Sequence, residues 1–154
     1  TGDWSSDVCS SDLNNISNVL IMVDEEGNLA DSSSTVIKRS IEQHKKWVEL
    51  AAELSCHSIR VNLAGEKDPE RWINKSVEGL TGLCEFSKTM GINIIVENHG
   101  GLSSNGSLLA QVMKKPIWKI AERFRILGIF ALQTLGGVTQ VAKNGMTCTK
   151  GFQN

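Results

Sequence analysis

The sequence has little net charge and no long apolar run. Its 154 residues include 16 Lys or Arg and 17 Asp or Glu, which gives a net charge of -1 and a pI of about 6.3. Nucleic-acid-binding proteins usually carry a basic face, so we expect no nucleic-acid partner. No run of about 18 apolar residues occurs, and we expect no membrane span. The polar, acidic start also lacks the features of a signal peptide.

Cysteines are few and scattered. The sequence contains no C-x-x-C pair, so its four cysteines predict neither a metal-binding cluster nor a disulfide framework. Cys56 and Cys84 fall at apolar positions of predicted helices, where we expect buried free thiols. A reducing, cytoplasmic location fits this cysteine usage.

The first 13 residues have no hydrophobic periodicity. The stretch Asp3–Leu13 matches, residue for residue, the translation of a common sequencing adapter. We therefore predict that residues 1–13 are a non-native, adapter-derived segment that takes no part in the fold. The remaining residues still suffice for one domain with its own core.

Strand and helix patterns alternate between residues 14 and 115. Apolar runs at 19–23, 57–63 and 92–96 predict three buried strands, and helical spacing predicts helices at about 35–55, 69–90 and 108–115. Such alternation is typical of parallel strands joined by right-handed crossovers.

Several residues mark the expected helix ends. Asp68 followed by Pro69 predicts the start of the second helix, and Gly91 predicts its end. Ser103 or Ser104 is the expected cap of the third helix. In the first helix, His44 is expected to lie on the water-facing side.

Polar residues end the third predicted strand. Strand alternation places Glu97 and His99 on one side of the chain, and Gly100 and Gly101 allow a sharp turn directly afterwards. In α/β barrels the active site is built at the carboxyl ends of the strands. The alternative interpretation is an ordinary strand that runs into a polar loop.

The second predicted strand has one apolar and one polar face. Ile59, Val61 and Leu63 alternate with Arg60 and Asn62. In a barrel the apolar face would meet the helices, and the polar face would point inward with Asn62 near the carboxyl end. A half-exposed edge strand is the alternative.

Residues 14–115 resemble the sugar phosphate isomerase/epimerase family of xylose-isomerase-like TIM barrels. The resemblance depends on the stretches Lys46–Ala52, Cys56–Asn62 and Ile94–Gly101. It implies an α/β fold, as a fragment of a (β/α)8 TIM barrel with about three βα units. A whole barrel takes about 250 residues, so this region would supply only the third, fourth and fifth strands.

The resemblance also implies a site. Glu97 matches a family glutamate that is a ligand of Mn²⁺ or Mg²⁺ and takes part in acid/base catalysis, and His99 matches a catalytic residue that lines the sugar site. Arg60 and Asn62 match positions where sugar contacts are expected. The reaction would be proton transfer next to the carbonyl of a keto sugar or sugar phosphate through an enediolate. The family's other ligands have no match in the chain, so we expect the chain as written to be inactive.

The sequence changes character after Lys115. Plausible codons for the family's next segment, which includes Pro-Asp-Phe-Gly, encode Ile117–Ala131 without a mismatch when they are read one base later. We therefore predict that residues 116–154 are an out-of-frame tail without a native fold.

Three functional hypotheses stay open from the sequence. The first is a metal-dependent sugar isomerase or epimerase. The second is an endonuclease for abasic DNA in the same superfamily, against which the near-neutral charge argues. The third is a non-catalytic fragment with no evolved function.

Overall fold

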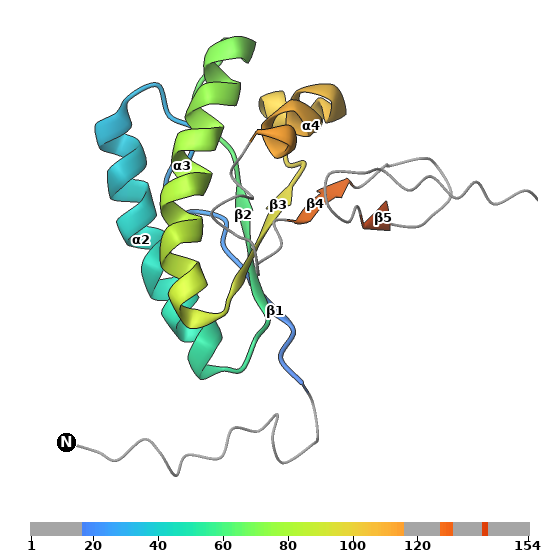
Figure 1. The fold of residues 1–154 in the computed structure, drawn as a ribbon. Coiled ribbons are helices and arrows are strands. Elements are labelled where there is room, and N and C mark those ends of the chain that lie inside the picture. Colours follow the sequence, from blue (N-terminus) through green and yellow to red (C-terminus); the bar gives the residue numbers. More distant parts are fainter. Residues whose placement is uncertain (1–16, 116–126, 131–139, 142–154) are drawn as a thin grey trace, which may run out of the picture.

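The computed structural model describes residues 17–115, 127–130 and 140–141. In chain order its elements are β1 (Leu20–Met22), α2 (Ser34–Glu53), β2 (Ser58–Asn62), α3 (Pro69–Met90), β3 (Asn93–Glu97), the 3-10 helix η2 (Gly101–Ser104), α4 (Gly106–Lys114), β4 (Leu127–Phe130) and β5 (Gln140–Val141) (Figure 1). The adapter-like residues 1–13 and most of the tail, 116–154, lie outside the described residues. The predictions for both segments stay predictions.

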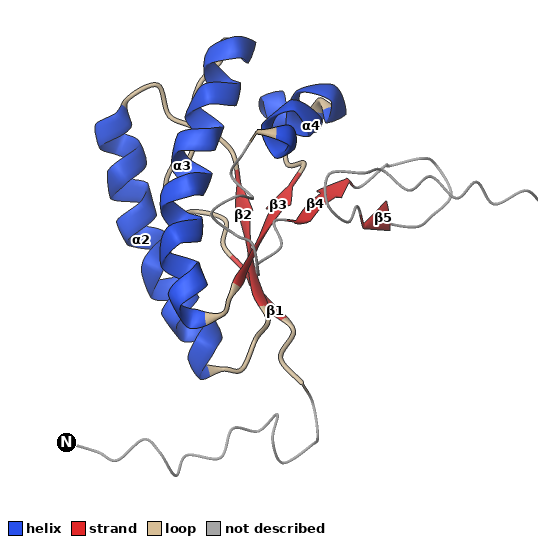
Figure 2. Ribbon diagram, viewed as in Figure 1, coloured by secondary structure: helices blue, strands red, loops and turns tan. Residues whose placement is uncertain are grey.

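The strands form one sheet in the order β1-β2-β3-β4-β5. The first four strands are parallel, and β5 pairs antiparallel with β4. Figure 2 shows α2 and α3 side by side along the same face of this sheet. The predicted alternation of parallel strands and helices between residues 14 and 115 is confirmed.

One apolar core joins the sheet to the helices. Ile59 and Val61 of β2 are fully buried, together with Val96 of β3. Trp72 of α3 packs into the same core, and its indole Nε1 donates a hydrogen bond to the Leu63 carbonyl at 3.1 Å. The apolar face of β2 therefore meets the helices, as predicted. The core also contains these helix residues: Val48, Ala51, Leu80, Leu83, Leu109 and Val112.

The predicted ends of the second helix are confirmed. The Asp68 carboxylate accepts a hydrogen bond from the Arg71 amide at 2.9 Å, and Pro69 is the first residue of α3. Gly91 ends the helix in the left-handed conformation, with φ 75°. The buried free thiols expected at Cys56 and Cys84 are also observed. Cys84 lies in α3 as predicted, whereas Cys56 lies between α2 and β2 and not in a helix.

The predicted cap of the third helix was wrong. Asn105 is the cap of α4, and its side chain accepts hydrogen bonds from the amides of Ser107 and Leu108 at 3.0 and 3.3 Å. Ser103 lies in η2, where its hydroxyl donates instead to the carbonyl of Gly100 at 2.8 Å. The serine oxygen is thus used to close the preceding turn.

The prediction for His44 was also wrong, because His44 is 2% exposed. Its Nδ1 lies 2.7 Å from the Ser40 carbonyl oxygen. The loop after β1 covers this side of α2: Glu26 forms an ion pair with Lys46 at 2.7 Å, and Gly27 lies against the Ser40 side chain. Burial lowers the pKa of the His44 imidazole.

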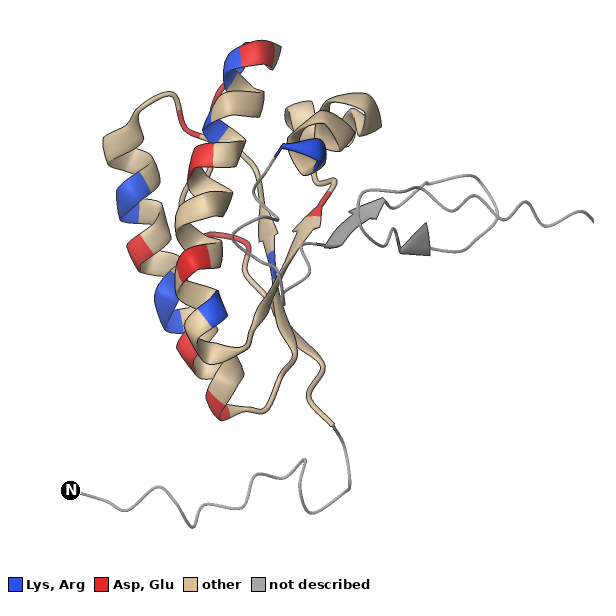
Figure 3. Ribbon diagram, in the orientation of Figure 1, with Lys and Arg blue, Asp and Glu red and all other residues tan. Residues whose placement is uncertain are grey.

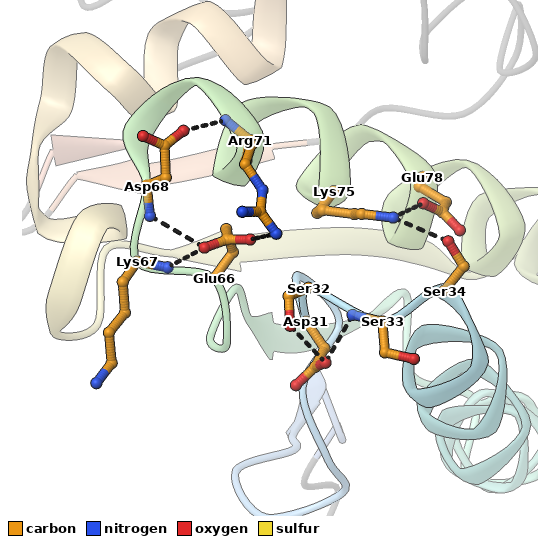
Figure 4. Close-up of polar contacts among 10 residues, drawn as sticks. All are labelled: Asp31, Ser32, Ser33, Ser34, Glu66, Lys67, Asp68, Arg71, Lys75 and Glu78. Carbon is orange, nitrogen blue, oxygen red and sulfur yellow. Dashed lines mark hydrogen bonds and ion pairs between the residues drawn. The ribbon is translucent and has the colours of Figure 1, made fainter.

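The loops after β1 and β2 are tied to each other and to the helices. The Ala30 amide donates to the Ala64 carbonyl at 3.1 Å, and the Glu66 amide donates back to the Ala30 carbonyl at 2.8 Å. Figure 4 shows the Glu66 carboxylate among the Lys67 and Asp68 amides and the Arg71 guanidinium. These bonds fix the chain at the carboxyl ends of β1 and β2.

Candidate active site

The inner face of the sheet, opposite the helices, carries polar residues at its carboxyl end. Arg60 is the register partner of Met22 in β1 and of Ile95 in β3, so these three residues lie on the same face. Two residues further on, Asn62 is the partner of Glu97. The polar face predicted for β2 therefore points away from the helix core, and it meets the Glu97 end of β3.

Arg60 is the centre of this group. It is only 8% exposed, and its Nη1 lies close to three side-chain oxygens: it donates hydrogen bonds to Asp24 and Asn62 and forms an ion pair with Glu97. These oxygens are Asp24 Oδ1 at 2.6 Å, Glu97 Oε2 at 2.9 Å and Asn62 Oδ1 at 3.3 Å. The Asn62 amide also donates to Asp24 Oδ1 at 3.1 Å. One guanidinium nitrogen thus gathers oxygens from the ends of three neighbouring strands.

Asp24 is the member of this group that sequence analysis missed. It directly follows the first predicted strand, at 19–23, and was not singled out as a site residue. The Val23 amide donates to the Arg60 carbonyl at 2.9 Å, which continues the parallel ladder past β1 and brings Asp24 level with Asn62. A signal was available, because Asp24, Asn62 and Glu97 are polar residues that lie at, or directly after, the carboxyl end of one strand of the predicted sheet.

The three charged side chains of this group differ in their exposure to solvent. The side chain of Arg60 is 9% exposed, against 30% for Glu97 and 55% for Asp24. A buried guanidinium without an anionic partner is strongly unfavourable, so the two carboxylates stabilise Arg60 in this position. In return, the hydrogen bond from Arg60 lowers the pKa of the Asp24 carboxyl.

His99 lies at the rim of the group. Its residue is exposed, and its carbonyl accepts a hydrogen bond from the Ser103 hydroxyl at 3.1 Å. Gly100 and Gly101 follow with φ of 65° and 53°, which confirms the predicted sharp turn. The charge of His99 contributes, after closer groups, to lowering the pKa of Asp24. The structure therefore brings Arg60 into direct contact with Asn62 and Glu97, and His99 follows Glu97 two residues later in the exposed turn.

The donor atoms of this group suit a hard divalent cation. Carboxylate and amide oxygens are the ligands that Mg²⁺ and Mn²⁺ prefer. In the described part of the chain, no group of three or more His, Cys, Asp or Glu side chains forms a metal cluster. A positive charge nevertheless already sits among these oxygens, in the guanidinium of Arg60. Glu97, with Asp24 beside it, is the residue that would hold a metal here.

Comparison with known protein families shows which family the chain belongs to. The family described as the xylose isomerase-like TIM barrel matches residues 11–123, which is well over half of the chain. The chain belongs to this family. No curated protein gives a significant match to it.

Family membership explains the architecture. The parallel strands and their covering helices form part of a TIM barrel, as the sequence resemblance implied. In TIM barrels the catalytic residues lie at the carboxyl ends of the strands. Asp24, Asn62 and Glu97 lie at those ends in this member of the xylose isomerase-like TIM barrel family.

Proposed function

We propose that residues 14–115 carry part of the active site of a metal-dependent sugar or sugar phosphate isomerase or epimerase. The observation that supports this most is the Glu97 carboxylate, held by Arg60 at the carboxyl end of β3 in a xylose isomerase-like TIM barrel. A carboxylate at that position is suited both to metal binding and to proton transfer.

In an isomerisation a proton leaves the carbon beside the carbonyl and is added to the former carbonyl carbon, while a second proton moves between the two oxygens of the enediolate. Glu97 takes the carbon-bound proton and returns it to the neighbouring carbon on the same face. In an epimerisation the new proton reaches the original carbon on the opposite face, from an acid other than Glu97. Arg60 and Asn62 donate hydrogen bonds to sugar oxygens, and His99 orients a hydroxyl from the rim. Glu97 would also be a ligand of Mn²⁺ or Mg²⁺, and such an ion would polarise the carbonyl and stabilise the developing negative charge.

The charge pattern argues against a nucleic acid as the partner. Figure 3 shows basic and acidic residues interspersed along α2 and α3, and the net charge of the chain is -1. A nucleic acid is usually bound by a surface of one positive sign, so this pattern does not favour an abasic-site endonuclease. No described helix is long and apolar enough to cross a membrane. The buried free thiols of Cys56 and Cys84 fit the proposed cytoplasmic location.

We expect the 154-residue chain as written to be inactive. Of the family's expected metal ligands, only Glu97 has a match in residues 14–115. Sequencing of the source DNA across codons 110–135 is therefore the first step. If one added or removed base after Lys115 restores Pro-Asp-Phe-Gly, the protein in the restored frame is the form to assay.

The test measures the exchange of carbon-bound hydrogen in the sugar for deuterium from the solvent. The restored-frame protein is incubated in D2O with Mn²⁺ and a panel of ketoses and ketose phosphates, and deuterium uptake next to the carbonyl is followed by proton NMR. Loss of a general acid or base lowers the rate by about 100- to 10,000-fold, so we expect a loss of this size in Glu97→Gln. Glu85→Gln, at an exposed position of α3, is the matched control and should keep the activity.

Three results would contradict the proposal. Equal exchange in the wild type and Glu97→Gln would exclude proton transfer by Glu97. Cleavage of abasic-site DNA without any exchange would favour the endonuclease. Neither activity in the restored-frame protein would favour a fragment without evolved function.

A further inference from the structure

The position of Arg60 raises a question about metal binding. Its Nη1 lies within 3.3 Å of oxygens from Asp24, Asn62 and Glu97, and the shortest of these contacts is 2.6 Å. A cation that touched all three oxygens from the same side would sit close to the position of this nitrogen. The guanidinium and a metal ion therefore cannot both occupy the centre of the group.

The geometry points to Arg60 as the resident counter-cation of Asp24, Asn62 and Glu97, which competes with a divalent metal for these oxygens. We propose that a metal reaches Glu97 only when the Arg60 guanidinium leaves the centre. Arg60 is then a positioning residue: it keeps two carboxylates close together without a metal and opposes metal entry. The inference rests on the proposed function, which makes Glu97 a metal ligand.

Asp24 gives Arg60 an alternative partner. It forms the shorter of the two ion pairs, 2.6 Å against 2.9 Å for Glu97, and its side chain is more exposed. Because the arginine side chain is long and carries several N–H donors, it can keep Asp24 while it releases Glu97. Metal binding would then exchange one cation for another at Glu97 and leave no buried charge unpaired.

A purely structural ion pair would give a different result on mutation. Removing Arg60 would then lower stability and loosen Glu97, so the metal affinity would fall or stay unchanged. If Arg60 instead competes with the metal, removing Arg60 should change the metal affinity in the opposite direction. Replacing Arg60 by an uncharged side chain removes both the occupant and its positive charge, so divalent affinity should rise.

The experiment measures Mn²⁺ binding to the 154-residue chain by electron paramagnetic resonance, without any substrate. We expect Arg60→Met to bind Mn²⁺ at least tenfold more tightly than the wild type, and Arg60→Lys, which keeps the charge, to resemble the wild type. Adding Glu97→Gln to Arg60→Met should abolish the gain. Arg71→Met is the matched control: Arg71 also pairs with a glutamate, Glu66 at 2.9 Å, but lies outside the group and should leave the affinity unchanged.

A second measurement does not depend on the folding of a variant. In the wild-type chain with ¹⁵N-labelled arginine, Mg²⁺ should shift the Arg60 side-chain NMR signal, assigned with Arg60→Lys, and leave that of Arg71 in place. Equal or weaker Mn²⁺ affinity in folded Arg60→Met, or an Arg60 signal unmoved at saturating Mg²⁺, would overturn the inference. Failure of the proposed function would look different: no carbon exchange in the restored-frame protein, while the gain in Mn²⁺ affinity persisted.

Discussion

Gly79 in α3 packs against the backbone of the loop between β1 and α2. A Cβ atom added at Gly79 would lie 2.0 Å from the carbonyl oxygen of Leu29, a residue that is fully buried. The obstacle is backbone, so no side-chain rotation can relieve it. Gly79→Ala must therefore push α3 away from the loop that carries the chain from Asp24 to α2.

The expected change in the free energy of unfolding of Gly79→Ala is the sum of two opposing effects. Alanine in a helix interior is favoured over glycine by about 1 kcal/mol. Overpacking of a filled core costs about 1–3 kcal/mol, and occasionally more. Because the contact would be far shorter than any normal Cβ contact, we take the upper part of that range. Gly79→Ala should then lower the free energy of unfolding by about 1–2 kcal/mol.

Gly82, one turn along the same helix, is a matched control. There an added Cβ would meet Ile41 Cδ1 at 2.7 Å, which is the free end of a flexible side chain on α2. The isoleucine can move, so Gly82→Ala should range from no change to a gain of about 1 kcal/mol. Urea unfolding followed by circular dichroism measures both variants. A Gly79→Ala variant as stable as Gly82→Ala would refute the close packing of α3 against the Leu29 backbone.

Two further predictions concern a helix cap and a buried histidine. Asp68→Ala should lower the free energy of unfolding by about 1 kcal/mol, because the Arg71 amide loses the acceptor that lies 2.9 Å away. Urea unfolding measures this, with Glu70→Ala, at an exposed position of the same turn, as the control. Equal losses of stability in the two variants would contradict the role of Asp68 as the cap. The pKa of His44 is lowered by burial from its ordinary value of 6.5, so the unfolded chain binds more protons below that pH and stability should fall as the pH drops below about 6.5. Urea midpoints between pH 5 and 8 should show this slope in the wild type and a shallower one in His44→Gln; equal slopes would exclude His44 as its source.

Local patterns predicted the backbone well. The cap at Asp68, the left-handed end at Gly91 and the alternating face of β2 are properties of a few consecutive residues. Their physics is contained in the sequence itself. For the same reason the polar ends of β2 and β3 could be located without any knowledge of tertiary contacts.

The errors arose where distant segments meet. His44 was placed on the surface because helical spacing alone cannot show that the loop containing Glu26 folds over α2. Asp24 was overlooked because its importance comes from a hydrogen bond with Arg60, 36 residues further along the chain, which depends on the pairing of β1 with β2. The ion pair between Arg60 and Glu97 likewise depends on the pairing of β2 with β3.

We propose that Glu97 transfers a proton in a sugar isomerase or epimerase. The most direct measurement compares deuterium uptake from D2O into ketoses by the restored-frame protein and its Glu97→Gln variant. We predict exchange at the carbon next to the carbonyl, and a loss of about 100-fold or more in the variant. Undiminished exchange in Glu97→Gln, or none in either protein, would contradict the account.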